Sequence, residues 1–332
     1  MSTMSADFNS DSNSDLESNR APSADIDDLD PSFCQALCEL RTILDLVRFG
    51  AARFEKAQLT FGHGHDNAID EAASLVLHTA GLRPDAQDLW LGARLTSGER
   101  KEALELLRRR IEQRIPAAYL IGKAWFAGLE FVCDQRALVP RSPIAQWIER
   151  GFEPWLDGDA DGLRIVDIGT GGGAIAIACA LAFENAIVDA VDISERALAL
   201  AQENRRRHGV EDRVRMIRSD LFEALSDERY HLIVSNPPYV DAKTMAALPF
   251  EYLHEPRLGL EAGDDGLVYI RRILSDAHRH LHPQGILVGE VGASRKALER
   301  AFPDLPFLWL ELEGESEGVF LLDRDSLAAA FD

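Results

Sequence analysis

Four consecutive residues, Asn236-Pro237-Pro238-Tyr239, have the side chains and the stiffness needed to act on a planar amino group. The two prolines fix the backbone and cannot continue a β-ladder, so the apolar run at 231–235 must end here. The Asn236 side chain and the Pro237 carbonyl can then accept hydrogen bonds from both N–H bonds of an –NH2 group, while Tyr239 stacks on its plane. Two such acceptors would orient a poorly nucleophilic amide or adenine nitrogen toward an electrophilic methyl group and stabilise its growing positive charge. This chemistry requires no metal ion.

A glycine-rich turn at 169–173 follows a second apolar run at 164–168. Glycines allow the backbone to bend sharply and let a ligand approach it closely. In an open α/β sheet, a nucleotide-type cofactor binds outside the carboxyl end of such a strand. The spacing from Gly169 to Ala174 satisfies the dinucleotide pattern of NAD enzymes, and the spacing from Asp167 to Gly173 satisfies that of S-adenosylmethionine-dependent methyltransferases. The turn alone therefore leaves the cofactor open.

Two aspartates follow the next two strand candidates. Asp192 could accept hydrogen bonds from both hydroxyls of a ribose in either class of enzyme. Asp220, followed by the apolar Leu221, fits a methyltransferase better, because an acidic residue there receives the adenine amine; Asp220 could equally be a helix N-cap. The Asn236 run favours the methyltransferase, since an NAD-dependent oxidoreductase would leave it without a role.

These residues require an open α/β sheet whose strands all end at one edge. After Gly162 the chain alternates between short runs rich in Ile, Val and Leu and helical patterns, which is typical of a parallel sheet covered on both faces. Strands are predicted at 164–168, 186–191, 214–218, 231–235 and 285–290, and helices near 174–182, 195–208, 266–281 and 295–302. The last two strands, at 307–312 and 318–322, are predicted to form an antiparallel hairpin. The predicted fold is α/β: a class I (Rossmann-like) methyltransferase domain with a mostly parallel sheet.

The chain divides into four predicted regions. Residues 1–30 carry eight acidic residues and one arginine among seven serines, which predicts a disordered acidic tail. Apolar residues recur at helical spacing over 31–124, which predicts a small all-α domain. In an enzyme of two domains, we expect this helical domain to recognise the substrate. A β-hairpin linker is expected at 125–150, and the catalytic domain at 151–332.

Composition excludes several kinds of partner. The chain has 332 residues and a formal net charge of −21, so it gains nothing electrostatically from duplex DNA and would attract a basic protein. No apolar run approaches the roughly 18 residues of a membrane span, and the N-terminus does not have the pattern of a signal peptide. The four cysteines are scattered, which disfavours a disulfide framework and a zinc site and favours the cytoplasm. Polar turns explain His63 and His65 better than metal binding does, so we predict no metal.

The glycine turn and the Asn236 run together resemble class I amino methyltransferases, which include DNA adenine-N6 and protein glutamine-N5 enzymes. Further segments are similar to the glutamine-N5 methyltransferases of the HemK or Prm family. These segments are Tyr119-Leu-Ile-Gly122, Phe126-Ala-Gly128-Leu-Glu-Phe131, Leu138-Val-Pro140-Arg141, Glu255-Pro256 and Gly263-Asp-Asp-Gly266-Leu. That family combines a helical N-terminal domain, a hairpin linker and a catalytic domain.

One motif indicates the branch of this family. The release-factor enzymes typically follow Pro-Arg with Pro-Glu/Asp-Thr-Glu, whereas Arg141 is followed here by Ser142-Pro143-Ile144. The segments at 61–72, 248–256 and 302–310 are similar to the PrmB-type branch, which methylates ribosomal protein three of the large subunit.

The resemblance implies transfer of a methyl group from S-adenosyl-L-methionine to the side-chain amide (N5) of a glutamine in that basic protein, free or in an assembly intermediate. The product of the cofactor is S-adenosyl-L-homocysteine. The predicted cofactor-binding residues are Asp167, Gly169, Thr170, Gly171, Gly172, Gly173, Asp192, Asp220, Leu221 and Asn236. The predicted catalytic residues are Asn236, Pro237 and Tyr239. These three, with Pro238, Glu251 and His254, are predicted to bind the substrate, although a plain surface loop explains Glu251 and His254 equally well.

Four alternatives stay open. Release-factor methylation shares the chemistry, but the Ser142-Pro143 departure disfavours it. DNA adenine methylation needs a basic face, which the net charge of −14 that remains outside residues 1–30 disfavours. An NAD-dependent oxidoreductase and a non-catalytic ribosome-assembly factor are the remaining two.

Overall fold

The computed structural model describes residues 31–83, 90–158, 162–225, 227–311 and 318–331. The predicted acidic tail at 1–30 lies outside the described residues. Within them, no helix is long and apolar enough to cross a membrane.

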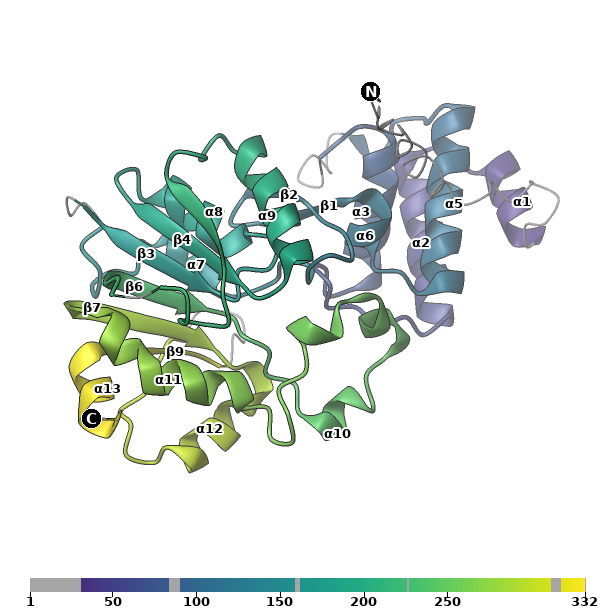
Figure 1. The fold of residues 1–332 in the computed structure, drawn as a ribbon. Coiled ribbons are helices and arrows are strands. Elements are labelled where there is room, and N and C mark those ends of the chain that lie inside the picture. Colours follow the sequence, from purple (N-terminus) through teal and green to yellow (C-terminus); the bar gives the residue numbers. More distant parts are fainter. Residues whose placement is uncertain (1–30, 84–89, 159–161, 226, 312–317, 332) are drawn as a thin grey trace, which may run out of the picture.

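A group of helices forms the N-terminal part (Figure 1). It consists of α1 (Pro31–Glu39), α2 (Ile43–Lys56), α3 (Ala68–Thr79), α5 (Ser97–Gln113) and α6 (Ala117–Ile121). Thr42 and Thr96 each begin a helix with a reciprocal capping box, which satisfies backbone N–H groups that the first turn leaves free. Leu46, Phe54 and Leu107 lie fully inside, so these helices enclose a hydrophobic core of their own.

A two-stranded hairpin connects this helical part to the sheet. Strand β1 (Lys123–Phe126) pairs antiparallel with β2 (Leu129–Val132), and the short helix α7 (Ile144–Glu149) follows. The hairpin thus begins two residues before the boundary predicted at 125. Asn204 fixes it to the catalytic domain, because its side chain bonds both the N–H and the carbonyl of Val132, at 2.8 and 3.1 Å.

The central sheet has seven strands in the order β5-β4-β3-β6-β7-β9-β8. These are β3 (Arg164–Ile168), β4 (Ile187–Asp192), β5 (Val214–Arg218), β6 (Tyr230–Ser235), β7 (Leu281–Glu290), β8 (Leu308–Trp309) and β9 (Val319–Asp323). The first five in chain order pair in parallel, and β9 pairs antiparallel with both β7 and β8. The predicted α/β fold with a mostly parallel sheet and a terminal antiparallel hairpin is confirmed.

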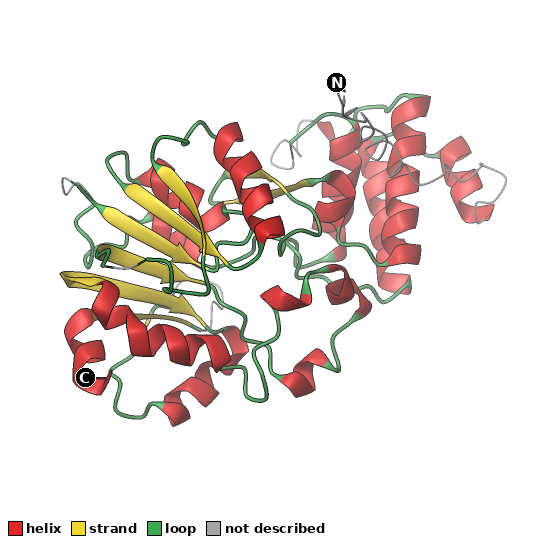
Figure 2. Cartoon of the chain, viewed as in Figure 1, coloured by secondary structure: helices red, strands yellow, loops and turns green. Residues whose placement is uncertain are grey.

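Helices cover both faces of the sheet (Figure 2). Helices α7, α8 (Ala174–Ala182) and α9 (Glu195–Arg207) lie on one face, and α11 (Val268–His280), α12 (Arg295–Ala301) and α13 (Arg324–Phe331) lie on the other. Successive residues of a strand point to opposite faces of the sheet, so Ile165 packs in the core with α7 and α8 and Val166 in the core with α11, α12 and α13. No helix was predicted after the hairpin, so α13 is a finding of the structure.

The segment between β6 and α11 leaves the sheet and passes beside the helical part (Figure 1). It contains α10 (Ala242–Met245) and two short 3-10 helices, η3 (Phe250–His254) and η4 (Arg257–Gly259). A third short 3-10 helix, η5 (Gly292–Ser294), follows β7.

Candidate active site

A cavity of about 550 Å³ opens at the carboxyl ends of β3, β4 and β6. This is the edge at which open α/β sheets bind their ligands, and the volume suits a small molecule. Residues 169–172 of the glycine turn and the whole Asn-Pro-Pro-Tyr turn line it together. Two motifs 63 residues or more apart in the chain thus meet because β3 and β6 are neighbours in register, with Ile168 opposite Ser235.

The glycine turn is held against the neighbouring strand. The backbone N–H groups of Gly169 and Thr170 both donate to the Val191 carbonyl, at 2.9 and 2.8 Å. Gly169 has a φ of +77°, and a Cβ there would meet no other atom within 4 Å, so the space above the turn is open to a ligand. Gly173, with a φ of +83°, does not line the cavity. A Cβ at Gly173 would approach that of Ala201 to 3.0 Å, so this glycine allows α8 and α9 to pack closely.

Asp167 supports the turn from behind. The side chain is fully buried and does not line the cavity. Its Oδ2 accepts hydrogen bonds from the Thr170 hydroxyl at 2.6 Å and from the Ala176 N–H at 3.1 Å. Burial raises the pKa of Asp167 to about 7, although both hydrogen bonds oppose that shift. The structure therefore places Asp167 behind the turn, where its hydrogen bonds shape the turn.

Asp192 faces the cavity with a fixed carboxylate. Its Oδ2 accepts from the Gly171 N–H at 2.9 Å and its Oδ1 from the Ser194 N–H at 2.8 Å. Each carboxylate oxygen has a second lone pair, so two hydroxyl donors can still be accepted. Burial raises the pKa of Asp192, and the backbone N–H groups partly offset that effect.

Asp220 and Leu221 line the same cavity beyond Asp192. No described helix begins at Asp220, so the N-cap interpretation is wrong. Its carboxylate instead accepts a hydrogen bond from Arg272 of α11 at 2.9 Å. Leu221 adopts a φ of +51°, which turns the chain sharply at this point. Arg272 also lines the cavity and was not predicted, because it lies within an ordinary amphipathic helix pattern.

The Asn-Pro-Pro-Tyr turn is braced from three sides. The Ser235 hydroxyl donates to the Ile168 carbonyl at 2.6 Å, which fixes the end of β6 to the end of β3. The Ser294 hydroxyl donates to the Tyr239 carbonyl at 2.9 Å. A Cβ at Gly266 would lie only 2.5 Å from that same carbonyl oxygen, which explains the glycine of the Gly263-Asp-Asp-Gly266 segment. Asn236 itself lines the cavity.

Glu290, at the end of β7, was not predicted and holds the ring of Tyr239. It accepts a hydrogen bond from the Tyr239 hydroxyl at 3.2 Å and another from the Ser142 hydroxyl. Burial raises the pKa of Glu290 to about 6 against the opposing effect of these two donors. Ser142, the residue that departs from the release-factor pattern, is thus part of the support of this turn.

A second buried carboxylate joins two further motifs. Glu255 accepts the Val139 N–H at 3.1 Å and forms a bidentate ion pair with Arg141, at 2.5 and 2.8 Å. Burial alone would raise the pKa of Glu255, but His63 and Arg141 outweigh it and hold the pKa at about 2. Arg141 lines the cavity, which the sequence had not assigned to it.

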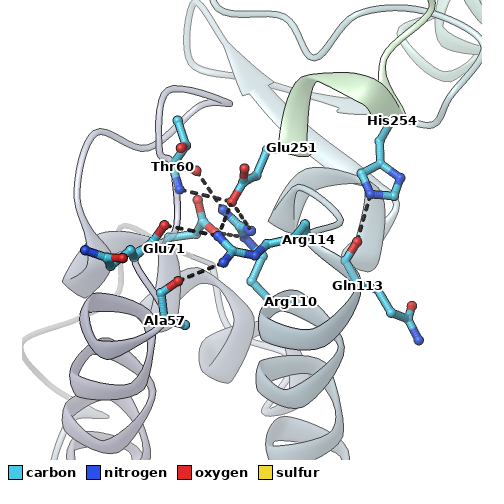
Figure 3. Close-up of polar contacts among 9 residues, drawn as sticks. Ala57, Thr60, Glu71, Arg110, Gln113, Arg114, Glu251 and His254 are labelled. Atoms are coloured by element: carbon cyan, nitrogen blue, oxygen red, sulfur yellow. Dashed lines mark hydrogen bonds and ion pairs between the residues drawn. The ribbon is translucent and has the colours of Figure 1, made fainter. Parts of the chain in front are cut away.

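The structure does not bring Glu251 and His254 into the cavity. Glu251 is 1% exposed and accepts hydrogen bonds from the Thr60 N–H at 3.0 Å and from Arg114 at 3.2 Å (Figure 3). Arg110, which also pairs with Glu71, lies 3.4 Å from the same Glu251 oxygen. A ring nitrogen of His254 lies 2.8 Å from the Gln113 carbonyl. Both residues fasten η3 to the helical part.

Comparison with known proteins agrees with this geometry. A family model described as "Methyltransferase small domain" matches residues 156–255. The ribosomal protein uL3 glutamine methyltransferase of Xanthomonas campestris pv. campestris is 50% identical over 88% of this chain and 94% of its own length. The protein of the same name from Neisseria meningitidis serogroup B is 47% identical over 89% of this chain and 97% of its own.

Solved structures are more distant. A methyltransferase from Pyrococcus furiosus has a TM-score of 0.42 at 18% identity and covers 59% of this chain and 89% of its own. TrmK of M. capricolum in complex with S-adenosyl-homocysteine has a TM-score of 0.34 at 14% identity, over 51% of this chain and 66% of its own.

The fold and the cavity are those of a class I S-adenosylmethionine-dependent methyltransferase. Within that class, the chain belongs to the family of ribosomal protein uL3 glutamine methyltransferases. The predicted membership in the glutamine-N5 methyltransferases, in the branch that acts on large-subunit protein three, is confirmed.

Proposed function

We propose that this chain methylates the side-chain amide nitrogen (N5) of one glutamine in ribosomal protein uL3, with S-adenosyl-L-methionine as the methyl donor. The observation that carries the proposal is that the glycine turn and the Asn-Pro-Pro-Tyr turn line one cavity. The relatives named above, half identical over most of the chain, support the same substrate.

The residues at the glycine turn fit the cofactor. The open space over Gly169 admits a ligand against the backbone, and Asp192 has lone pairs left for the two hydroxyls of a ribose. Asp220 with Leu221 lies at the same cavity, where a carboxylate beside an apolar side chain suits an adenine. When bound, S-adenosylmethionine supplies an electrophilic methyl group on a sulfonium sulfur.

Asn236 and the Pro237 carbonyl would hold the glutamine amide. An amide nitrogen is a poor nucleophile because its lone pair is delocalised into the carbonyl group. Two acceptors on its two N–H bonds orient that lone pair and stabilise the positive charge that develops on nitrogen. After methylation the nitrogen loses one proton to water, so the residues here need no strong base. Tyr239, held by Glu290, stacks on the planar amide.

Charge and composition support a basic protein substrate and a location in the cytoplasm. The net charge of −21 is complementary to a basic ribosomal protein and opposes binding to duplex DNA. The scattered cysteines fit a reducing cytoplasm, where ribosomal proteins are made. Both free uL3 and an assembly intermediate that exposes the same glutamine are compatible with this site.

The proposal is tested by offering three acceptors separately with methyl-labelled S-adenosylmethionine: uL3, a peptide-release factor and duplex DNA. We expect label on uL3 alone. Label on the release factor would keep the mechanism and change the substrate, and label on DNA would contradict the charge argument. No label on any acceptor, despite measured cofactor binding, would favour a non-catalytic assembly factor.

A further inference from the structure

Three large apolar side chains project from the segment that follows the Asn-Pro-Pro-Tyr turn. Phe250, Leu253 and Leu258 are 71%, 68% and 50% exposed, and the first two are the most exposed large hydrophobic residues in the described part of the chain. We call these three residues the rim surface. Exposed apolar side chains that gather in one short segment mark interaction sites more often than scattered ones do.

The rim surface is displayed by a segment that is anchored on its inner side. Glu251, between Phe250 and Leu253, is buried in the ion-pair cluster with Arg110 and Arg114 (Figure 3). Glu255 is likewise buried, in its ion pair with Arg141. The outward exposure of Phe250 and Leu253 therefore accompanies tight packing on the other side of the same turns. A surface ordered in advance loses little entropy when a partner binds.

The same segment forms one wall of the active cavity. Leu248, Tyr252 and Leu258 line the cavity that also contains Asn236. Leu258 belongs both to this lining and to the rim surface, so the two surfaces share a residue. Tyr252 is fixed between its neighbours, with the His63 ring 4.4 Å away and the Arg141 guanidinium 5.8 Å from its own ring.

A protein substrate whose glutamine enters this cavity must cross its rim. In an extended chain, a residue two positions from the glutamine lies about 7 Å away along the backbone. Its side chain then lies outside the position that takes the amide, where the segment that carries the rim surface can contact it. A polar substrate residue beside the glutamine would gain little free energy from contact with leucine and phenylalanine side chains. An apolar substrate residue would remove apolar surface from water on both partners, which favours binding.

We propose that the rim surface docks apolar side chains that flank the target glutamine in uL3 and so contributes to substrate specificity. This inference rests on the proposed function. The acidic charge of the chain attracts basic partners in general, and the rim surface adds a local requirement on the residues beside the glutamine.

The test compares steady-state kinetics of wild type and a Phe250→Ala/Leu253→Ala double variant on purified uL3. Neither residue lines the cavity, and both are exposed, so the fold and cofactor binding should be preserved. We expect the KM for uL3 to rise at least tenfold, with kcat and the Kd for S-adenosylmethionine within twofold of wild type. The control is Leu181→Ala, an exposed leucine near the end of α8 and thus toward the opposite edge of the sheet, which should leave KM unchanged.

A second arm uses a peptide that spans the target glutamine, with its flanking apolar residues changed to serine. The wild type should methylate the unaltered peptide in preference to the serine peptide, and the Phe250→Ala/Leu253→Ala variant should show no such preference. The effects of the two changes should therefore not add. Absence of methylation by the wild type would overturn the proposed function and this inference with it. An active wild type whose KM matches that of the double variant would overturn the docking role alone. Light scattering gives a third outcome. If the wild type is a dimer, the double variant is a monomer and KM is unchanged, the rim surface binds a second copy of the chain, and the docking role is overturned.

Discussion

The Tyr239 hydroxyl donates a hydrogen bond of 3.2 Å to Glu290, which joins the Asn-Pro-Pro-Tyr turn after β6 to the end of β7. Glu290 also accepts the Ser142 hydroxyl, so one carboxylate supports the turn and the segment that enters the catalytic domain. The ring that should stack on the substrate amide is therefore oriented by a group that does not line the cavity.

This relationship predicts a pH dependence of activity. Burial raises the pKa of Glu290 to about 6, and only its ionised form can accept both hydrogen bonds freely. We expect kcat/KM of the wild type to fall as pH drops below about 6. In Glu290→Gln that inflection should be absent and the activity at pH 8 roughly tenfold lower, which corresponds to about 1.4 kcal/mol. The pH–rate profiles of both proteins test this expectation. The same inflection in the variant would show that Glu290 does not cause it.

Asp192 should determine cofactor affinity. Hydrogen bonds to a charged group contribute about 1.5–3 kcal/mol, so Asp192→Ala should weaken S-adenosylmethionine binding by about ten- to a hundredfold. Titration calorimetry measures this directly. Glu195→Ala changes an exposed carboxylate three residues away and serves as the control. Equal Kd values for the two variants would contradict the assigned role of Asp192.

Asp167 should make stability depend on pH. Its pKa rises from 3.8 to about 7 on burial, so the folded state binds this proton more tightly than the unfolded state. Protonation of Asp167 therefore favours the folded state at low pH, and this contribution to the free energy of unfolding is lost as pH rises through about 7. Relative to wild type, Asp167→Asn should therefore gain unfolding free energy between pH 4 and pH 8, by up to about 4 kcal/mol. Urea unfolding across that range tests the sign, with the exposed Asp66→Asn as the control.

Arg110 should be far more important for stability than its neighbour Arg108 on α5. Arg110 is fully buried and pairs with Glu71 and Glu251, one from each side of the junction between the helical part and η3. Removing it leaves buried carboxylates poorly compensated, at about 3–5 kcal/mol. Arg108→Ala removes only pairs with the half-exposed Glu105 and Glu112 and should cost less than about 1 kcal/mol. Comparable destabilisation of the two variants would refute the distinction.

Local pattern explains which parts of the fold could be predicted. Strand β3 and helix α8 match their predicted bounds, because a buried apolar run, a glycine turn and an alanine-rich helix succeed each other without interruption. Helix α13 was missed because only Leu327 is buried among its eight residues, which gives no recurring apolar pattern, and it forms where Leu327 packs into the core.

The residues of the site that could be predicted are likewise those with a local sequence pattern. Asn236 and Asp192 were predicted because each directly ends a recognisable strand. Glu290 and Ser142 were missed because their contact joins residues 148 positions apart, and no local pattern records it. Glu251 was predicted to bind the substrate from its acidity, whereas its partners in the structure lie on the helical part.

The most direct test of the account locates the methyl group itself. Purified uL3 is incubated with S-adenosylmethionine and either wild type or Asn236→Ala, digested, and analysed by fragmentation mass spectrometry. We predict one added methyl on the side-chain amide of a single glutamine with the wild type. With Asn236→Ala we predict a rate at least about a hundredfold lower, with cofactor binding retained. A methyl group on another residue type, or an unchanged rate with Asn236→Ala, would contradict the central claim.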